Sequence, residues 1–302
     1  MTRAIYSLYI DIPKDELDDQ PPHYGYTLPK TLHTKIELKK NYDWLKSMQQ
    51  RYANKLNIEY KLFEYDKNYK EYHRWFKNEY PQITSYNIVN FYKIHLMYEL
   101  SKKYDEILYL DFDAIPIRDK NFFDYHDFND GVHILTGTTE SQSTVDTDSS
   151  GIHYEANRRK ESRKHSNRSP TAKYWNAKAM CISEGITGDH TVYNTGIVGI
   201  NKDNLQKLSY FKNFDYTMEL MDRLRGEEGK MYPLYIHELF GYDNESIWAY
   251  KTLLNEVATI KLDNTWHHFM DKWNYIPHST NIVHCINKNF KYVREYCEKN
   301  NL

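Results

Sequence analysis

Two aspartates, Asp111 and Asp113, interrupt the apolar run EILYLDFDAIPI of residues 106–117. The run predicts a strand, and alternate side chains of a strand point to the same face, so the two carboxylates are expected side by side. Such a pair repels itself unless a cation or a proton lies between. Oxygen ligands of this kind suit Mg²⁺ or Mn²⁺, and ligands bind at the carboxyl ends of strands in open α/β sheets. We therefore expect a divalent metal here; the alternative is that one aspartate caps the next turn and the other is solvated.

The elements that must position this pair alternate between strands and helices. Strands are expected over residues 4–10, 58–65, 106–113, 197–200 and 281–285. Helices are expected within residues 30–56, through SYNIVNFYKIHLMYELSKKY, after a cap at Asn201 and over residues 243–254. Such alternation predicts an α/β fold with a mostly parallel sheet flanked by helices, and 302 residues suit a single domain.

Residues 138–183 differ from the rest of the chain. They are polar and charged, without apolar periodicity, and so predict a flexible insertion or a lid. A second Asp-x-Asp, formed by Asp146 and Asp148, lies inside this segment with no strand before it. We expect that pair to be solvated loop. The single domain of residues 1–302 then divides into a part over 1–135, the insertion over 138–183 and a part over 184–302.

Composition excludes several classes of partner. The net charge is −2, which argues against nucleic acid and anionic membranes as partners. Three widely spaced cysteines argue against a disulfide framework and a zinc cluster. No window of about 18 uncharged apolar residues occurs, so we expect no transmembrane anchor. The sequence indicates an intracellular, cytoplasmic protein.

Asp-x-Asp after an apolar strand also occurs in haloacid-dehalogenase-type phosphatases. In that class a small turn and Thr or Val follow the motif, whereas Ala114 and Pro116 stand here on either side of an isoleucine. That class also needs a downstream acidic motif, and GDHTVY offers only Asp189, with Tyr193 where a second aspartate would fall. A metal-dependent phosphohydrolase remains the weaker alternative.

Four segments in order resemble the successive motifs of GT-A glycosyltransferases, above all those of the retaining family 8 group with glycogenin and bacterial galactosyltransferases. They are YDEILYLDFDAIPI, YNTGIVGINKD, GYDNESIWAY and NIVHCINK. The resemblance implies a GT-A (Rossmann-like) fold and transfer of a sugar, with retention, from a nucleotide sugar such as a UDP-sugar. The acceptor would be a hydroxyl of a carbohydrate, glycan or glycoprotein. Residues 1–135 would bind the nucleotide, and residues 184–302 the donor sugar and acceptor.

The resemblance also implies a set of residues at the metal and the nucleotide. Mn²⁺ (or Mg²⁺) would be held by Asp111, Asp113 and His284. Lys288 would reach the diphosphate, although Asn287 replaces the glycine of the family pattern and the lysine comes two residues early. The nucleotide sugar would further be contacted by Tyr9, Ile10, Lys93 and Phe112.

At the donor sugar the resemblance implies Asn194, Thr195 and Gly196, in which the glycine lets the backbone approach closely. Asp243, Asn244 and Glu245 would be the catalytic segment, although a plain helix cap would use the same residues. His267 and His268 match nothing in the pattern. A degenerate GT-A domain with a binding or scaffolding role is the non-enzymatic alternative. As an enzyme, the chain would suit the cytoplasm of a bacterium, a phage or a large virus.

Overall fold

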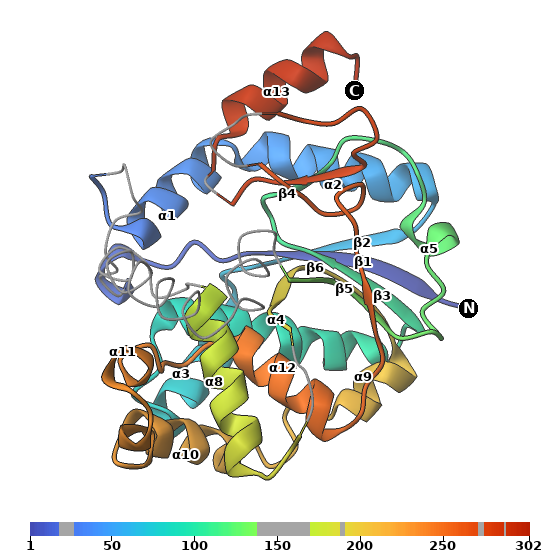
Figure 1. Cartoon of the computed structure of the whole chain (residues 1–302). Coiled ribbons are helices and arrows are strands. Elements are labelled where there is room, and N and C mark those ends of the chain that lie inside the picture. The colour runs from blue at the N-terminus through green and yellow to red at the C-terminus, as the bar shows by residue number, and fades with distance from the viewer. Residues whose placement is uncertain (18–26, 138–169, 188–190, 271–274, 287) are drawn as a thin grey trace.

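A mixed central sheet forms the middle layer of the molecule (Figure 1). The computed structural model describes residues 1–17, 27–137, 170–187, 191–270, 275–286 and 288–302. Within these residues the sheet has six strands in the order β2-β1-β3-β6-β5-β7. The strands are β1 (Arg3–Tyr9), β2 (Glu59–Glu64), β3 (Glu106–Leu110), β5 (Val132–Thr136), β6 (Tyr193–Asn201) and β7 (Thr259–Lys261).

The strand directions confirm the mostly parallel sheet expected from the sequence. β1 pairs in parallel with β2 and β3, and β5 pairs in parallel with β7. Only β6 among these strands runs the other way, antiparallel to both β3 and β5. The carboxyl ends of β1 and β3 therefore lie at one edge of the sheet, beside the amino end of β6.

A second, smaller sheet has the order β4-β9-β8. Its strands are β4 (Ala114–Pro116), β8 (His268–Phe269) and β9 (Ile282–His284). β4 follows β3 after a short turn and pairs antiparallel with β9, so that Ala114 lies opposite His284. This pairing brings a segment near the carboxyl end of the chain next to the Asp-x-Asp turn.

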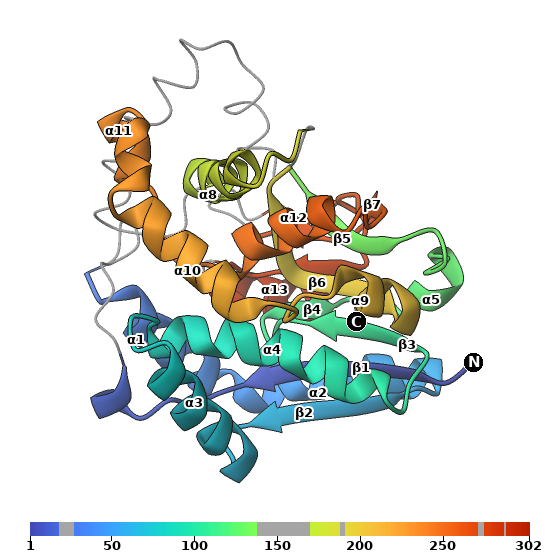
Figure 2. The same ribbon diagram turned by 90° about the horizontal axis from the view of Figure 1, so that it is seen from below.

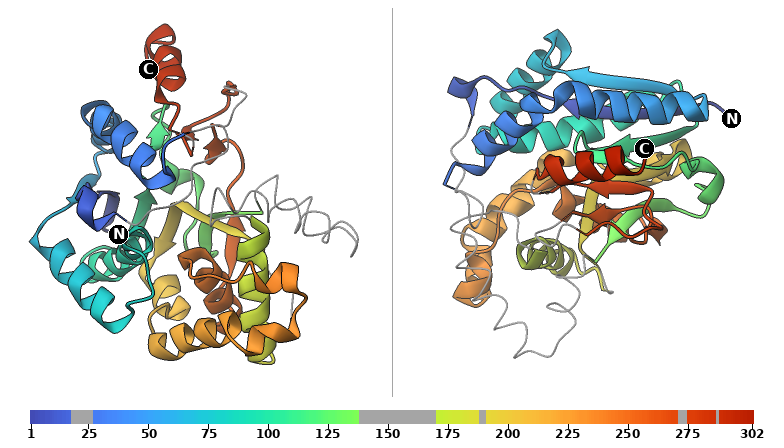
Figure 3. Two further views of the ribbon diagram at one scale, coloured as in Figure 1. Left: turned by 90° about the vertical axis from the view of Figure 1, so that its left-hand side faces the viewer. Right: turned by 90° about the horizontal axis from the view of Figure 1, so that it is seen from above.

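Helices cover both faces of the central sheet. On one side lie α1 (Lys30–Lys40), α2 (Tyr42–Leu56) and α13 (Phe290–Lys299), as Figure 1 and the view from above in Figure 3 show. Figure 2 shows the opposite side, covered by α3 (Lys67–Glu79), α4 (Ser85–Ser101), α8 (Pro170–Ser183), α9 (Lys202–Leu208), α10 (Phe214–Arg225) and α12 (Asn244–Leu254). The short helical segments are η1 (Lys14–Glu16), α5 (Phe122–Tyr125), η2 (Glu228–Met231) and α11 (Leu234–His237).

Alternation along the strands divides the core between the two helical layers. In β3, Ile107 and Tyr109 face the layer of α4 and α12, whereas Leu108 and Leu110 face the layer of α2. In the first of these layers Phe76 stacks on Phe91, with ring centroids 5.1 Å apart. Burial of such large apolar side chains on both faces fixes the sheet as the rigid element on which the site is built.

Side-chain caps fix the starts of several helices. Thr84 accepts a hydrogen bond from the Asn87 N–H at the start of α4, and Asn201 accepts one from the Asn204 N–H at the start of α9, as the sequence predicted. Each cap satisfies a helical N–H group that has no partner within the helix.

Two expectations differ from the structure. The helical stretch expected within residues 30–56 is two helices, because the chain turns at Asn41 between α1 and α2. Residues 170–183, the last part of the expected insertion, form α8, whose buried face includes Ala172, Ala177 and Met180 at helical spacing. Residues 170–183 were interpreted together with the polar stretch before them, so their apolar helical spacing was not recognised. Residues 138–169, including Asp146 and Asp148, lie outside the described residues.

Candidate active site

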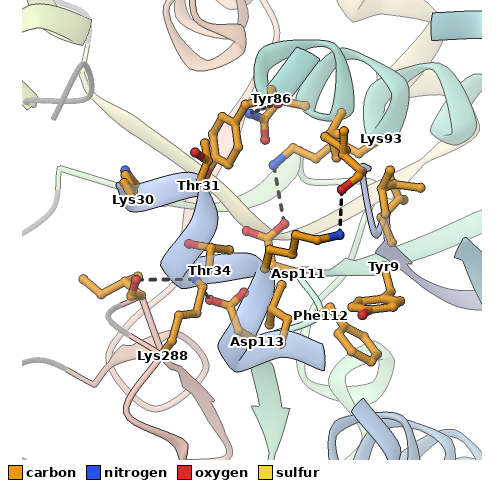
Figure 4. Close-up of a pocket in the computed structure, with 18 of the residues that line it drawn as sticks. Tyr9, Lys30, Thr31, Thr34, Tyr86, Lys93, Asp111, Phe112, Asp113 and Lys288 are labelled. Carbon is orange, nitrogen blue, oxygen red and sulfur yellow. Dashed lines mark hydrogen bonds and ion pairs between the residues drawn. The ribbon is translucent and has the colours of Figure 1, made fainter. Parts of the chain in front are cut away.

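A cavity of about 330 Å³ lies at the carboxyl ends of β1 and β3 (Figure 4). Eleven of the residues singled out in the sequence line it: Tyr9, Ile10, Lys93, Asp111, Phe112, Asp113, Asn194, Asn244, Glu245, His284 and Lys288. Thr195, Gly196 and Asp243 do not line the cavity. Segments far apart in the chain therefore converge on one place, as the order of the motifs predicted.

A tight turn, and not strand alternation, brings the two aspartates together. β3 ends at Leu110, and the Ala114 N–H donates to the Asp111 carbonyl over 2.8 Å to close the turn. The Asp111 N–H donates to the carbonyl of Gly196 on β6, and the Cys285 N–H donates to the carbonyl of Asp113. Backbone bonds to both sheets thus fix the turn.

Three ligand atoms meet in the cavity, from Asp111, Asp113 and His284, all within 4.8 Å of one another. His284 Nε2 lies 3.7 Å from Asp111 Oδ2 and 3.6 Å from Asp113 Oδ1. These separations are too long for hydrogen bonds, but they suit ligands that share one small cation, since each ligand would stand about 2 Å from it. Two carboxylate oxygens and one imidazole nitrogen form a donor set that fits Mn²⁺.

The second oxygen of each aspartate is held by the protein. Asp111 Oδ1 accepts a hydrogen bond from the Tyr109 hydroxyl and lies 3.6 Å from Lys93 Nζ. Asp113 Oδ2 is ion-paired with Lys288 (Figure 4). Each carboxylate therefore turns one oxygen to protein donors and the other to the point it shares with His284.

The surrounding charges keep Asp113 ionised. Burial alone would raise its pKa, but Lys288 and His284 hold the pKa of this carboxyl well below its usual range. Burial would lower the pKa of Lys288, yet Asp113 brings it above its usual value. Burial and the Asp111 charge raise the pKa of Tyr109 well above its usual value, so its hydroxyl stays a donor. Asp113 therefore presents an anionic carboxylate at neutral pH.

Lys288 reaches the site although it comes earlier in the chain than the family pattern places it. Its backbone takes a left-handed conformation, with φ of +60°. Such a conformation is unusual for a residue with a side chain and costs about 1 kcal/mol or more. Lys288 in this conformation is ion-paired with Asp113. The early position thus does not keep Lys288 out of the cavity, whereas Asn287 lies outside the described residues.

A buried polar network forms the other end of the cavity. Glu245 Oε1 accepts hydrogen bonds from the Thr195 N–H (2.8 Å) and the Thr195 hydroxyl (3.1 Å). Glu245 Oε2 is ion-paired with Lys173 of α8. Asn244 Nδ2 donates to Thr195 Oγ1 over 3.0 Å, and Lys93 Nζ donates to the Thr195 carbonyl over 3.1 Å. Thr195 therefore braces the cavity wall from behind.

Lys173 and Lys93 determine the charge of Glu245. Burial alone would raise its pKa, but the two lysines and the Thr195 N–H lower the pKa of Glu245 to about 2. The carboxylate is thus anionic, and it is held by the Thr195 N–H, the Thr195 hydroxyl and Lys173. It is a fixed acceptor at the edge of the cavity.

Asp243 has a different place from its neighbours. Its Oδ1 accepts from the N–H groups of Glu245 (3.0 Å) and Ser246 (2.8 Å), so it is the N-cap of α12. Burial raises its pKa above the usual value. Asp243 therefore forms the helix cap that the sequence offered as the alternative interpretation. A catalytic role for Asp243 stays a prediction.

Gly196 is required by an imidazole. A Cβ on this residue would stand 2.3 Å from Cε1 and 2.8 Å from Nδ1 of His284. Real Cβ atoms do not approach other atoms so closely, hence only glycine leaves room for the ring. The structure thus gives Gly196 a close approach to the metal-ligand candidate, and the expected approach of its backbone to a donor sugar stays a prediction.

Several cavity residues were missed in the sequence. Lys173 lies in the segment that was interpreted as an insertion, and Tyr109 was counted only as an apolar strand residue. α1 contributes Lys30, Thr31, Thr34 and Lys35 to the lining. The pattern that marks α1 is helical, but nothing in it indicates that its first turns face a cavity.

Comparison with known proteins gives weak matches to one kind of enzyme. No protein-family model matches the sequence, and no curated protein does so. Among solved structures, a glycosyltransferase involved in glycosylation of the major capsid of PBCV-1 is similar over 98% of this chain and 100% of its own, with 13% identity and a TM-score of 0.44. The galactosyltransferase LgtC, in complex with donor and acceptor sugar analogues, is similar over 93% of this chain and 86% of its own, with 10% identity and a TM-score of 0.45. Mouse xyloside xylosyltransferase 1 is similar over 94% and 98%, with 10% identity and a TM-score of 0.43. Similarity this low does not by itself define an activity.

None of the helices in the described residues has the length and apolar character that a membrane crossing needs.

Proposed function

We propose that the chain is a metal-dependent glycosyltransferase that moves a sugar from a nucleotide sugar, a UDP-sugar, to a hydroxyl of a carbohydrate, glycan or glycoprotein. One observation carries the proposal. A single cavity combines a three-ligand cation cluster with two lysines, Lys93 and Lys288, and it has an aromatic wall and a wall of amide and carboxylate groups. These features meet the three needs of a nucleoside diphosphate sugar: a contact for the base, neutralisation of the diphosphate by the cation and the lysines, and polar acceptors and donors for the sugar.

The aromatic wall is suited to the base. Tyr9 and Phe112 lie with ring centroids 5.1 Å apart, and Figure 4 places both on the same side of the two aspartates. A planar base stacks on such rings through its π-face. Asp11, which follows two residues after Tyr9, also lines the cavity and is ion-paired with Lys35.

The cationic groups are suited to the diphosphate. Asp111, Asp113 and His284 would hold Mn²⁺ or Mg²⁺, which supplies Lewis-acid stabilisation of the charge that develops on the departing diphosphate. Lys288 offers a compact ammonium group next to Asp113 and would contact a phosphate oxygen. Lys93, held by the Thr195 carbonyl, adds a second cation near Asp111. Both lysines would favour the departing diphosphate, which gains a negative charge as its bond to the sugar breaks, over the bound sugar nucleotide.

The polar wall is suited to the sugar. Asn194, Asn244 and Glu245 line the cavity together, and their amide and carboxylate groups can bond hydroxyls in both directions. In the transfer, the bond from the anomeric carbon to the diphosphate breaks, the acceptor oxygen bonds to that carbon, and the acceptor proton passes to the departing diphosphate. Glu245 is too firmly ion-paired to act as the base, which agrees with retention through attack on the face of the leaving group.

Two measurements test the proposal. Thermal unfolding with Mn²⁺ and a series of UDP- and GDP-sugars should show a shift with a UDP-sugar, because a ligand at about 100 times its Kd stabilises the folded state by about 2.7 kcal/mol. Slow Mn²⁺-dependent hydrolysis of that donor should be lost by about 100-fold or more in Asp113→Asn. Asp203→Asn, on the exposed side of α9, is the matched control and should leave both unchanged.

The alternatives give different results. Release of phosphate from simple monoesters would favour the phosphohydrolase. Metal-dependent nucleotide binding without turnover would favour a scaffolding role. No thermal shift with any nucleotide sugar would refute the proposal.

A further inference from the structure

His267, one of the two histidines that matched no motif, is buried against the cation cluster. It lies immediately before β8 and has 0% of its surface exposed. Its ring packs against Phe269 and His284, with centroids 5.0 and 5.1 Å away, and these two rings also touch each other. Its N–H group donates to the carbonyl of Asp263 over 2.9 Å, so the loop before β8 fixes its backbone.

One hydrogen bond joins the two imidazoles. His267 Nε2 lies 2.9 Å from His284 Nδ1, while His284 Nε2 faces Asp111 and Asp113. A ring nitrogen that binds a cation carries no proton, so the proton of neutral His284 must be on Nδ1. His284 then donates to His267 Nε2, and the proton of His267 is on its own Nδ1.

The buried imidazole of His267 lowers the stability of the folded protein. His267 Nδ1 is buried and has no hydrogen-bond partner among the described residues. A buried donor left without a partner destabilises a protein by about 1–3 kcal/mol, whereas an apolar ring of similar size would fill the same space against Phe269 and His284. What a phenyl ring cannot provide is an acceptor for His284.

We propose that His267 is a positioning residue that holds His284 in the tautomer and orientation that direct Nε2 to the point shared with Asp111 and Asp113. The inference depends on the proposed function in one respect: His284 must be a metal ligand. Gly196 lies against the His284 ring and leaves room for it. His267 forms a hydrogen bond with His284 Nδ1, the ring nitrogen that does not face the two aspartates. Groups that bond the outer nitrogen of a ligating histidine set its orientation and its basicity, and their loss weakens metal binding by about 10–100-fold.

The neighbouring histidine supplies a matched control. His268 is half-buried, its Nε2 lies 2.7 Å from the Tyr275 carbonyl, and it makes no hydrogen bond to His284. His267→Phe removes the acceptor and keeps a ring, His267→Gln keeps an acceptor on a flexible side chain, and His268→Phe makes the same change one residue along.

The test measures Mn²⁺ binding to the whole chain, with and without UDP, from the electron paramagnetic resonance signal of free Mn²⁺. His267→Phe should bind Mn²⁺ about 10–100-fold more weakly, His267→Gln should recover most of that loss, and His268→Phe should match the parent. Thermal stability without metal should stay close to that of the parent in His267→Phe, because the unpartnered donor of His267 is gone while the Nδ1–H of His284 loses its acceptor. Nitrogen-15 spectra of the imidazoles should show His284 protonated at Nδ1 in the parent and a mixture of tautomers in His267→Phe.

Two results overturn the inference in distinguishable ways. If His284→Ala abolishes Mn²⁺ binding but His267→Phe binds as the parent does, His267 has no positioning role although the metal site is real. If His284→Ala binds Mn²⁺ as the parent does, the proposed metal site fails, and the role of His267 fails with it. Equal Mn²⁺ loss in His267→Phe and His268→Phe would also count against it.

Discussion

Replacement of Glu245 by glutamine should reveal how much the buried Lys173–Glu245 pair contributes to stability. The amide keeps an oxygen for the Thr195 N–H and hydroxyl, but it removes the negative charge beside Lys173. Lys173 would then be a mostly buried cation without its partner. Removal of one partner of a buried ion pair is one of the few single substitutions that lower the free energy of unfolding strongly.

The magnitude follows from the pKa of Glu245. It falls from 4.5 to about 2 in the folded protein, and each unit of difference corresponds to about 1.36 kcal/mol, so ionised Glu245 stabilises the fold by an amount on the order of 3 kcal/mol. Because the folded pKa is the lower one, this contribution is complete above about pH 5. It is lost as the pH falls from about 4.5 toward 2.

Urea denaturation at a series of pH values measures the effect. At neutral pH the Glu245→Gln protein should be less stable than the parent by that order of magnitude, and by pH 3 the difference should shrink by about 2 kcal/mol. Glu79→Gln, on the exposed side of α3, is the control and should change stability by no more than about 0.5 kcal/mol at any pH. A difference between parent and Glu245→Gln that stays constant from pH 7 to pH 3 would refute the reasoning.

Three further substitutions test other parts of the structure. Gly196→Ala should displace the His284 ring and weaken Mn²⁺ binding by about 10–100-fold in calorimetric titration, at a cost in stability of about 1–3 kcal/mol from overpacking. Lys288→Met should leave Asp113 buried without its ammonium partner, so that Mn²⁺ raises the Tm of this variant more than that of the parent. Phe91→Ala should lower the free energy of unfolding by about 3–5 kcal/mol in urea while activity per folded molecule is kept.

Each of these has a contrary outcome. Parental Mn²⁺ affinity in Gly196→Ala would mean that His284 is not confined as the structure has it. An equal Mn²⁺ shift in Lys288→Met and the parent would show that the lysine does not neutralise Asp113. Loss of activity per folded molecule in Phe91→Ala would mean that Phe91 contributes more than core packing.

The local patterns of the chain predict much of the fold. Apolar runs and helical periodicity indicated β1, β3, α4 and α12 close to their observed bounds, and the Asp243 and Asn201 caps are where polar residues precede a periodic stretch. These elements depend on interactions within a few residues, which a sequence displays directly. The metal cluster was predicted for a partly wrong reason, since a turn and not an alternating strand brings Asp111 and Asp113 together.

What could not be predicted depends on contacts between distant segments. Lys173 meets Glu245 only because α8 packs against α12, and no local pattern marks either residue as the partner of the other. His267 acquires its role from the loop before β8 and from the pairing of β8 with β9. Two adjacent histidines in a sequence do not show which of them is buried or which ring nitrogen faces a ligand.

The pairing of β4 with β9 has a consequence for the order of folding. Ala114 and His284 face each other across this pair, so the contact closes a loop that spans more than half of the chain, and contacts so distant in sequence form slowly. During synthesis Asp113 emerges long before His284 and Lys288, the two residues that lower its pKa inside the protein. A nascent chain that ends before β9 can pair β1, β2 and β3, but it must leave this carboxylate in water. The cavity is therefore expected to close last, after the carboxyl-terminal segment has docked, and ribosome-bound chains truncated before residue 282 should expose the Asp-x-Asp turn to solvent.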